Sequence, residues 1–242
     1  YLTLIDPTTG SILRRLEVPG AVHHVGVTPD NRYAIATHLQ TGNVSIIDLK
    51  THELAATVPT GPNPNYATPA PDGKTVYVSN SGNGTVSELD AVEGYVRRNI
   101  RVGEGPEHLV LSRDGERLYV NNTGSGSVSV VALPEGKVVE TFETGRNPHG
   151  IDLGREQRTL FVALTGEDRV LAIDLASGEK RILALGPMPY HLAHIPGEGQ
   201  LYVSSRGEPK VWVLDEESLT LESEFATRGI AHQTALAPER QP

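Results

Sequence analysis

Leu111-Ser-Arg-Asp-Gly-Glu-Arg-Leu-Tyr-Val120 joins a polar Asp-Gly turn to a short apolar run, and similar segments recur along the chain. Close copies occupy residues 27–36 and 70–79, and weaker copies end at Val162 and Val203. The aromatic positions of four copies are separated by 42, 42 and 41 residues: Tyr77, Tyr119, Phe161 and Tyr202. A repeat of this length, built from short strands and tight turns, is typical of one blade of a β-propeller.

Each repeat is expected to contain four strands, as the third repeat illustrates. Strands are predicted over residues 106–112, 117–121, 127–132 and 137–143, because β-branched and apolar residues fill these segments. Gly, Asn, Asp and Pro separate them, as turns require. A sheet with two apolar faces needs a neighbour on each side, so the repeats are expected to stack as one all-β propeller.

The two ends of the chain match parts of one blade. Residues 1–10 match a third strand and its turn, residues 11–18 match a fourth strand, and residues 230–236 match a first strand. We therefore expect a single domain over residues 1–242, with 1–18 and 230–242 forming one split blade. This arrangement gives about six blades, or a part of a ring of seven or eight.

Composition excludes several classes of function. The net charge is −9 with no run of like charge, which disfavours nucleic acid and anionic membranes as partners. No apolar run is long enough to span a bilayer. The chain has no cysteine, so a transition metal would need histidine, carboxylate or tyrosine ligands. We expect a monomer whose partner is a small ligand or another protein.

Histidines concentrate at two neighbouring positions of the repeat. Of nine histidines, six fall in two rows at the start of each first strand. The first row is His23, Asn65, Glu107, His149, Tyr190 and His232; the second row is His24, Tyr66, His108, Gly150, His191 and Gln233. Because first strands line the channel of a propeller, both rows are predicted at one mouth of it. Adjacent strand residues point to opposite sides, so both rows can serve this mouth only if the strands begin irregularly.

The rows predict a site for a transition metal or a metal tetrapyrrole. Neutral imidazole is a ligand for copper, zinc and iron, and it is a common axial ligand of haem. The predicted metal ligands are His23, His24, His108, His149, His191 and His232. The residues predicted to contact a cofactor are Tyr66, Glu107 and Tyr190. His38, in a hairpin, is expected to open onto the same face but farther from the axis. His52, in an exposed turn on the opposite face, and His194, deeper along its strand, are expected to be structural.

The segments Val76-Tyr-Val-Ser-Asn80 and Leu118-Tyr-Val-Asn-Asn122 resemble the Tyr-Val-Thr-Asn family of bacterial β-propeller repeats. The resemblance covers essentially the whole chain and implies a periplasmic or extracellular protein. The wider group includes the haem propeller of nitrite reductase and the copper propeller of nitrous-oxide reductase. Only His23, His24 and His149 resemble the copper motifs of the latter, and its other ligand motifs are not found.

Two other classes of function remain open. One is a propeller lactonase or lyase, in which a lyase site could be built from Glu107 and His108 with a neighbouring histidine as acid or base. Lactonase-like propellers hold calcium with carboxylate and amide oxygens, whereas the rows offer only Glu107 and Asn65 for this metal. A scaffold propeller without chemistry would instead bind a protein or a glycan with its polar rim loops.

Overall fold

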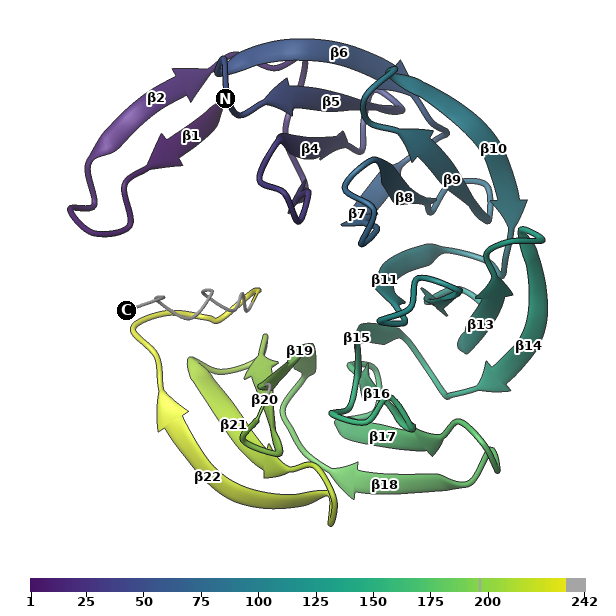
Figure 1. Ribbon diagram of the computed structural model, residues 1–242. Coiled ribbons are helices and arrows are strands. Elements are labelled where there is room, and N and C mark those ends of the chain that lie inside the picture. The colour runs from purple at the N-terminus through teal and green to yellow at the C-terminus, as the bar shows by residue number, and fades with distance from the viewer. Residues whose placement is uncertain (196, 234–242) are drawn as a thin grey trace. The chain divides into compact units, whose positions relative to one another are not determined.

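The computed structural model describes residues 1–195 and 197–233, which form strands and turns (Figure 1). A two-stranded sheet pairs β1 (Leu2–Ile5) with β2 (Ile12–Leu16). Five four-stranded sheets follow, each made of consecutive antiparallel strands. The first sheet comprises β3 (Val25–Val27), β4 (Tyr33–His38), β5 (Asn43–Asp48) and β6 (Glu53–Pro59). The second comprises β7 (Pro64–Pro69), β8 (Thr75–Asn80), β9 (Thr85–Asp90) and β10 (Tyr95–Arg101).

The remaining sheets repeat this pattern. The third comprises β11 (Pro106–Leu111), β12 (Arg117–Asn122), β13 (Ser127–Ala132) and β14 (Lys137–Glu143). The fourth comprises β15 (Pro148–Leu153), β16 (Thr159–Leu164), β17 (Arg169–Asp174) and β18 (Lys180–Ala184). The fifth comprises β19 (Pro189–Ile195), β20 (Gln200–Ser205), β21 (Lys210–Asp215) and β22 (Thr220–Ala226). None of the described residues is helical, and so none belongs to a helix that could cross a membrane.

The chain divides into two compact units. Unit 1 comprises Tyr1–Ser125 and Ser129–Glu140, and unit 2 comprises Gly126–Val128 and Thr141–Pro242. Unit 1 therefore contains the two-stranded sheet, the first two four-stranded sheets and most of the third. Unit 2 contains the fourth and fifth sheets.

Each unit has its own apolar core between stacked sheets. In unit 1, Ile46 of β5 and Val78 of β8 belong to one buried cluster that joins the first two sheets. In unit 2, Phe161 of β16 and Trp212 of β21 belong to one cluster that joins the fourth and fifth sheets. The middle strands are buried on both faces, which explains their nearly continuous apolar sequences. Each fully buried side chain of this size contributes about 1.5–3 kcal/mol relative to an exposed one.

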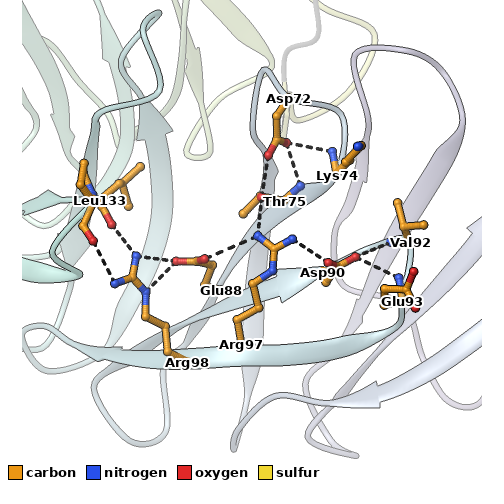
Figure 2. Close-up of polar contacts among 11 residues, drawn as sticks. Asp72, Lys74, Thr75, Glu88, Asp90, Val92, Glu93, Arg97, Arg98 and Leu133 are labelled. Atoms are coloured by element: carbon orange, nitrogen blue, oxygen red, sulfur yellow. Dashed lines mark hydrogen bonds and ion pairs between the residues drawn. The ribbon is translucent and has the colours of Figure 1, made fainter.

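A network of charged groups ties the second sheet to the third within unit 1 (Figure 2). Arg97 contacts Asp90 at 2.6 Å, and Arg98 contacts Glu88 at 2.7 Å. Arg98 also donates to the backbone carbonyl of Leu133, in the turn between β13 and β14. Because both arginines are about one-third exposed, water screens these pairs, and each contributes roughly 0–1 kcal/mol.

The predicted repeat is confirmed as an all-β propeller fold. The strands expected in the third repeat agree with β11 to β14 to within one residue at each end. Residues 1–10 and 11–18 contain β1 and β2, as expected for the third and fourth strands of a blade. The first strand predicted over 230–236 is not present in residues 230–233, and residues 234–236 lie outside the described part of the chain. The single domain and the split blade remain predictions.

Candidate functional site

Each four-stranded sheet from the second onward begins with the same irregularity. In the second sheet Pro64 pairs with Asn80 and Ala67 pairs with Val78, so three steps along β7 match two along β8. The same shift follows the first proline of the later inner strands, at Pro106, Pro148 and Pro189. Such a β-bulge re-aims the side chains of the residues that it leaves out of the regular pairing.

The bulge lies at the two rows of the sequence repeat. In β7 its residues are Asn65 and Tyr66, and in β19 they are Tyr190 and His191. The irregular strand start that the two rows require is therefore present. A bulge is the physical reason that two consecutive residues of one strand can both contact rings of the neighbouring blade.

In the first, second and fifth sheets a hydroxyl on the second strand joins the start of the inner strand to the following segment of the repeat. Thr37 Oγ1 accepts from the His24 amide at 3.1 Å and donates to the Asn65 carbonyl at 2.9 Å. Ser79 repeats this in the next blade, accepting from Tyr66 and donating to the carbonyl of Glu107. In unit 2, Ser204 accepts from the His191 amide and donates to the carbonyl of His232. The repeat pattern did not predict these hydroxyls, although all three occupy the same repeat position.

The second-row rings of unit 1 form a chain of aromatic contacts. Tyr66 stacks on His24 with ring centroids 3.7 Å apart and an interplanar angle of 23°. His108 packs edge-on against Tyr66, with ring centroids 4.6 Å apart. The structure therefore brings together three residues of the predicted site in unit 1.

His24 is committed to the backbone of the next blade. The amide of Ala67 donates to His24 Nδ1 at 3.2 Å, which places the proton of the neutral ring on Nε2. Burial, as the larger cause, and the neighbouring imidazole of His23 together lower the pKa of His24 to about 4. The only lone pair of the neutral ring is thus already engaged.

Other predicted residues of unit 1 have different surroundings. His23 is exposed, and its Nδ1 lies 3.1 Å from the Asn65 carbonyl. Glu107 is half-buried. His38 does not open to the surface as expected: it is fully buried, with Ser45 Oγ at 2.8 Å from Nε2 and the Ala21 carbonyl at 3.2 Å from Nδ1. In the next repeat, Asn80 occupies the position of His38 and donates to Ser87, which occupies the position of Ser45. The contact between His38 and Ser45 therefore belongs to the repeat, and His38 has a structural role.

Unit 2 gathers four rings of the predicted site. Tyr190 stacks on His149 at 3.8 Å and 18°. His191 lies edge-on to His149 at 5.3 Å and tilted to His232 at 5.4 Å. The ligating nitrogens of His149 and His191 lie within 4.8 Å of one another, and both side chains are buried.

Gly150 and Arg206 shape this cluster. A Cβ at Gly150 would lie 2.3 Å from the Tyr190 carbonyl, so only glycine permits this approach of β15 and β19. The guanidinium of Arg206 covers the ring of Tyr190 at 4.7 Å and donates to its hydroxyl at 2.9 Å. The sequence analysis missed Arg206, which replaces Ser81, Thr123 and Thr165 of the earlier repeats.

The sequence matches the family described as "Lactonase, 7-bladed beta-propeller" over residues 51–216, more than half of the chain. The chain belongs to this lactonase family. No curated protein matches its sequence.

Two solved structures resemble this lactonase-family chain. One is Kuenenia stuttgartiensis hydrazine synthase, with a TM-score of 0.83 and 22% identity, where the match covers 93% of this chain and 80% of the other. The other is a putative 6-phosphogluconolactonase from Bacteroides fragilis NCTC 9343, with a TM-score of 0.78 and 16% identity, covering 93% of this chain and 76% of the other. At these identities both comparisons establish the fold alone.

The ring cluster of unit 2 gives this lactonase-family propeller two chemical options. Two buried imidazoles at this separation can bind a transition metal together, because two imidazole ligands of one metal approach within a few ångströms. A neutral imidazole can also take a proton from water as a general base. Neither option uses calcium chemistry, since imidazole nitrogen is a poor partner for that hard cation.

Proposed function

We propose that this chain is a transition-metal-binding member of the lactonase propeller family, with a site built from the imidazoles of the two rows. The observation that carries the proposal is the buried His149–His191 pair, whose nitrogens lie within 4.8 Å of one another. His108 holds the same repeat position as His191, and His232 the same position as His149. We propose these two as the further ligands.

The remaining predicted residues have supporting roles in this proposal. Tyr190 and Tyr66 pack against imidazoles and hold their planes, and Glu107 supplies a carboxylate at the repeat position of His149. His23 could reach a larger group such as a tetrapyrrole through Nε2, since its Nδ1 contacts a carbonyl. His24 has the weakest case as a ligand, because its lone pair accepts from Ala67.

Metal titration of the purified protein tests the site. Co²⁺ or Zn²⁺ at a hundredfold excess over its Kd should stabilise the fold by about 2.7 kcal/mol, which raises Tm by roughly 5–10 °C. The variant His149→Ala/His191→Ala should lose this rise, and His108→Ala should weaken it. The matched control is His52→Asn, because His52 lies in a turn at a φ of 56° that asparagine tolerates. A wild type without any metal-dependent shift would refute the proposal.

Lactone hydrolysis is the second candidate, and the family match over residues 51–216 favours it. A bound metal would lower the pKa of water, and without metal the imidazole of His149 or His191 would serve as the base. A pH-stat assay with simple lactones, with and without a chelator, distinguishes the two routes. By the resemblance of its repeats we further propose a periplasmic or extracellular location.

A further inference from the structure

Three titratable residues of unit 2 occupy repeat positions that are mostly apolar elsewhere. His194 replaces Val27, Pro69, Leu111 and Leu153, as the strand pairing shows. Glu216 replaces Leu49, Ala91, Leu133 and Leu175. Asp152 replaces Gly26, Thr68, Val110 and Ala193. Titratable residues at positions that are apolar in the other repeats indicate a site with a specific role, because proteins break local packing rules mainly at such sites.

These three residues contact one another across two blades. The amide of His194 donates to Asp152 Oδ2 at 2.8 Å, which joins β19 to β15. His194 Nδ1 lies 2.8 Å from Glu216 Oε2, in the turn after β21. The other oxygen of Glu216 accepts from the amide of Arg155, in the turn after β15, at 2.7 Å. The fourth blade is thus tied to the fifth through side chains of the repeat positions that changed.

Stability does not explain this cluster. Burial raises the pKa of Asp152, because an ionised carboxylate is less stable in this buried position than in water. Replacing a buried charged group and its partners by apolar residues of similar size is often neutral or stabilising. The other repeats already carry such residues. What ionic contacts add is a defined geometry between the strands that they join.

The strands so joined are those that carry the candidate site. Asp152 follows His149 by three residues on β15, and His194 follows His191 by three residues on β19. These two strands lie side by side (Figure 1). Above the cluster, the missing side chain of Gly150 lets the Tyr190 carbonyl approach β15 closely. The spacing of β15 and β19 is therefore fixed both at the bulge and beyond it, and the positions of both imidazoles depend on it.

In the other blades this position makes a looser contact. Thr68 of β7 donates to the Leu109 carbonyl of β11 at 3.2 Å, and Gly26 of β3 offers no side chain to β7. Among the described blade pairs, a carboxylate at this position occurs only between β15 and β19. These are also the strands whose rows place two buried histidine nitrogens together.

We propose that Asp152, His194 and Glu216 are positioning residues that set the separation of the His149–His191 pair. They touch no ligand themselves and act through the spacing of β15 and β19. The inference rests on the proposed metal site, for which the imidazole separation decides the affinity.

The test replaces the cluster by residues from the other repeats: Asp152→Val/His194→Leu/Glu216→Leu. The variant should fold with a Tm equal to or above that of the wild type. Its affinity for Co²⁺, measured by calorimetry and by the visible spectrum of the bound ion, should fall about tenfold, as for other outer-shell changes. Asp152→Asn keeps an oxygen for the His194 amide and should retain most of the affinity. Asp152→Val alone replaces the triple variant if that does not fold.

Equal Co²⁺ affinity in the triple variant and the wild type would overturn the inference, and so would an equally large loss in Asp152→Asn. A wild type that binds no Co²⁺ would instead refute the proposed function. In that case crystal structures of the metal-free wild type and triple variant decide the positioning role. A change in the 5.3 Å separation of the His149 and His191 rings supports it, and an unchanged separation overturns it.

Discussion

In unit 1 Tyr66 stacks on His24 at 3.7 Å, and in unit 2 Tyr190 stacks on His149 at 3.8 Å, so both units place a phenol against an imidazole at a bulge. The two units differ in what surrounds this stack. In unit 1 a backbone amide occupies Nδ1 of His24. In unit 2 a second imidazole, His191, packs edge-on to His149, and Arg206 covers the tyrosine.

His24 and His191 share one repeat position but have different surroundings. His24 serves the fold, because it satisfies an amide of the neighbouring blade and stays neutral. The nitrogens of His149 and His191 lie within 4.8 Å of one another. Four substitutions and a pH series test how the two units differ, beginning with the largest expected effect.

Acid should destabilise the protein through His24. The pKa of His24 is about 4 in the folded protein and 6.5 in the unfolded chain, so only the unfolded chain takes up a proton between these values. The contribution of His24 to the free energy of unfolding is therefore fully present above pH 6.5. It is lost as the pH falls towards 4, which lowers the free energy of unfolding by on the order of 3 kcal/mol. Urea unfolding at pH 7, 6, 5 and 4.5 measures this loss, and His24→Gln should reduce it.

Asp152 should act in the opposite direction in unit 2. Its pKa is raised in the folded protein, so this group favours folding more as the pH falls through that pKa. The variant Asp152→Asn should therefore make the acid-induced loss of stability steeper in the same urea series.

A His24→Gln protein with the same pH profile as the wild type would mean that His24 is not held neutral by the fold.

Gly150→Ala should disrupt the ring cluster of unit 2. The new methyl group would lie 2.3 Å from the Tyr190 carbonyl, and moving β19 away should cost about 1–3 kcal/mol. Fluorescence of Trp212, the single tryptophan and a member of the unit 2 core, reports this loss during unfolding. Gly229→Ala is the control, because no atom lies within 4 Å of a Cβ there. Equal stabilities for the two variants would show that the strands can separate freely at this bulge.

Thr37→Val should lower the free energy of unfolding by about 1 kcal/mol, because it removes the hydroxyl that joins β4 to the bulge of β7. The hydroxyl accepts from the His24 amide and donates to the Asn65 carbonyl, and both contacts are buried. Thr37→Ser keeps the hydroxyl and should be less destabilising. Denaturant midpoints of the three proteins measure the difference. If valine and serine have the same effect, the hydroxyl does not hold the bulge.

The repeat pattern was sufficient to locate the strands and to group the histidines. Strand limits in the third repeat and the two rows follow from the recurrence of turns and apolar runs, which are local features. His194 shows where this approach fails. Its sequence position suggested a structural residue inside the strand, whereas it contacts Asp152 and Glu216. The sequence could have predicted these contacts, because the positions of Asp152, His194 and Glu216 are mostly apolar in the other repeats.

By itself the sequence determined the all-β fold and the four-stranded blades, because period and turn residues act over a few neighbouring residues. Only the tertiary structure showed that a backbone amide of the next blade occupies His24, whereas His149 and His191 pack against each other. His24 receives its partner from Ala67 of the next blade, and the approach of Tyr190 to Gly150 also joins two blades. Contacts between residues some 40 positions apart depend on how blades pack, which no local pattern encodes.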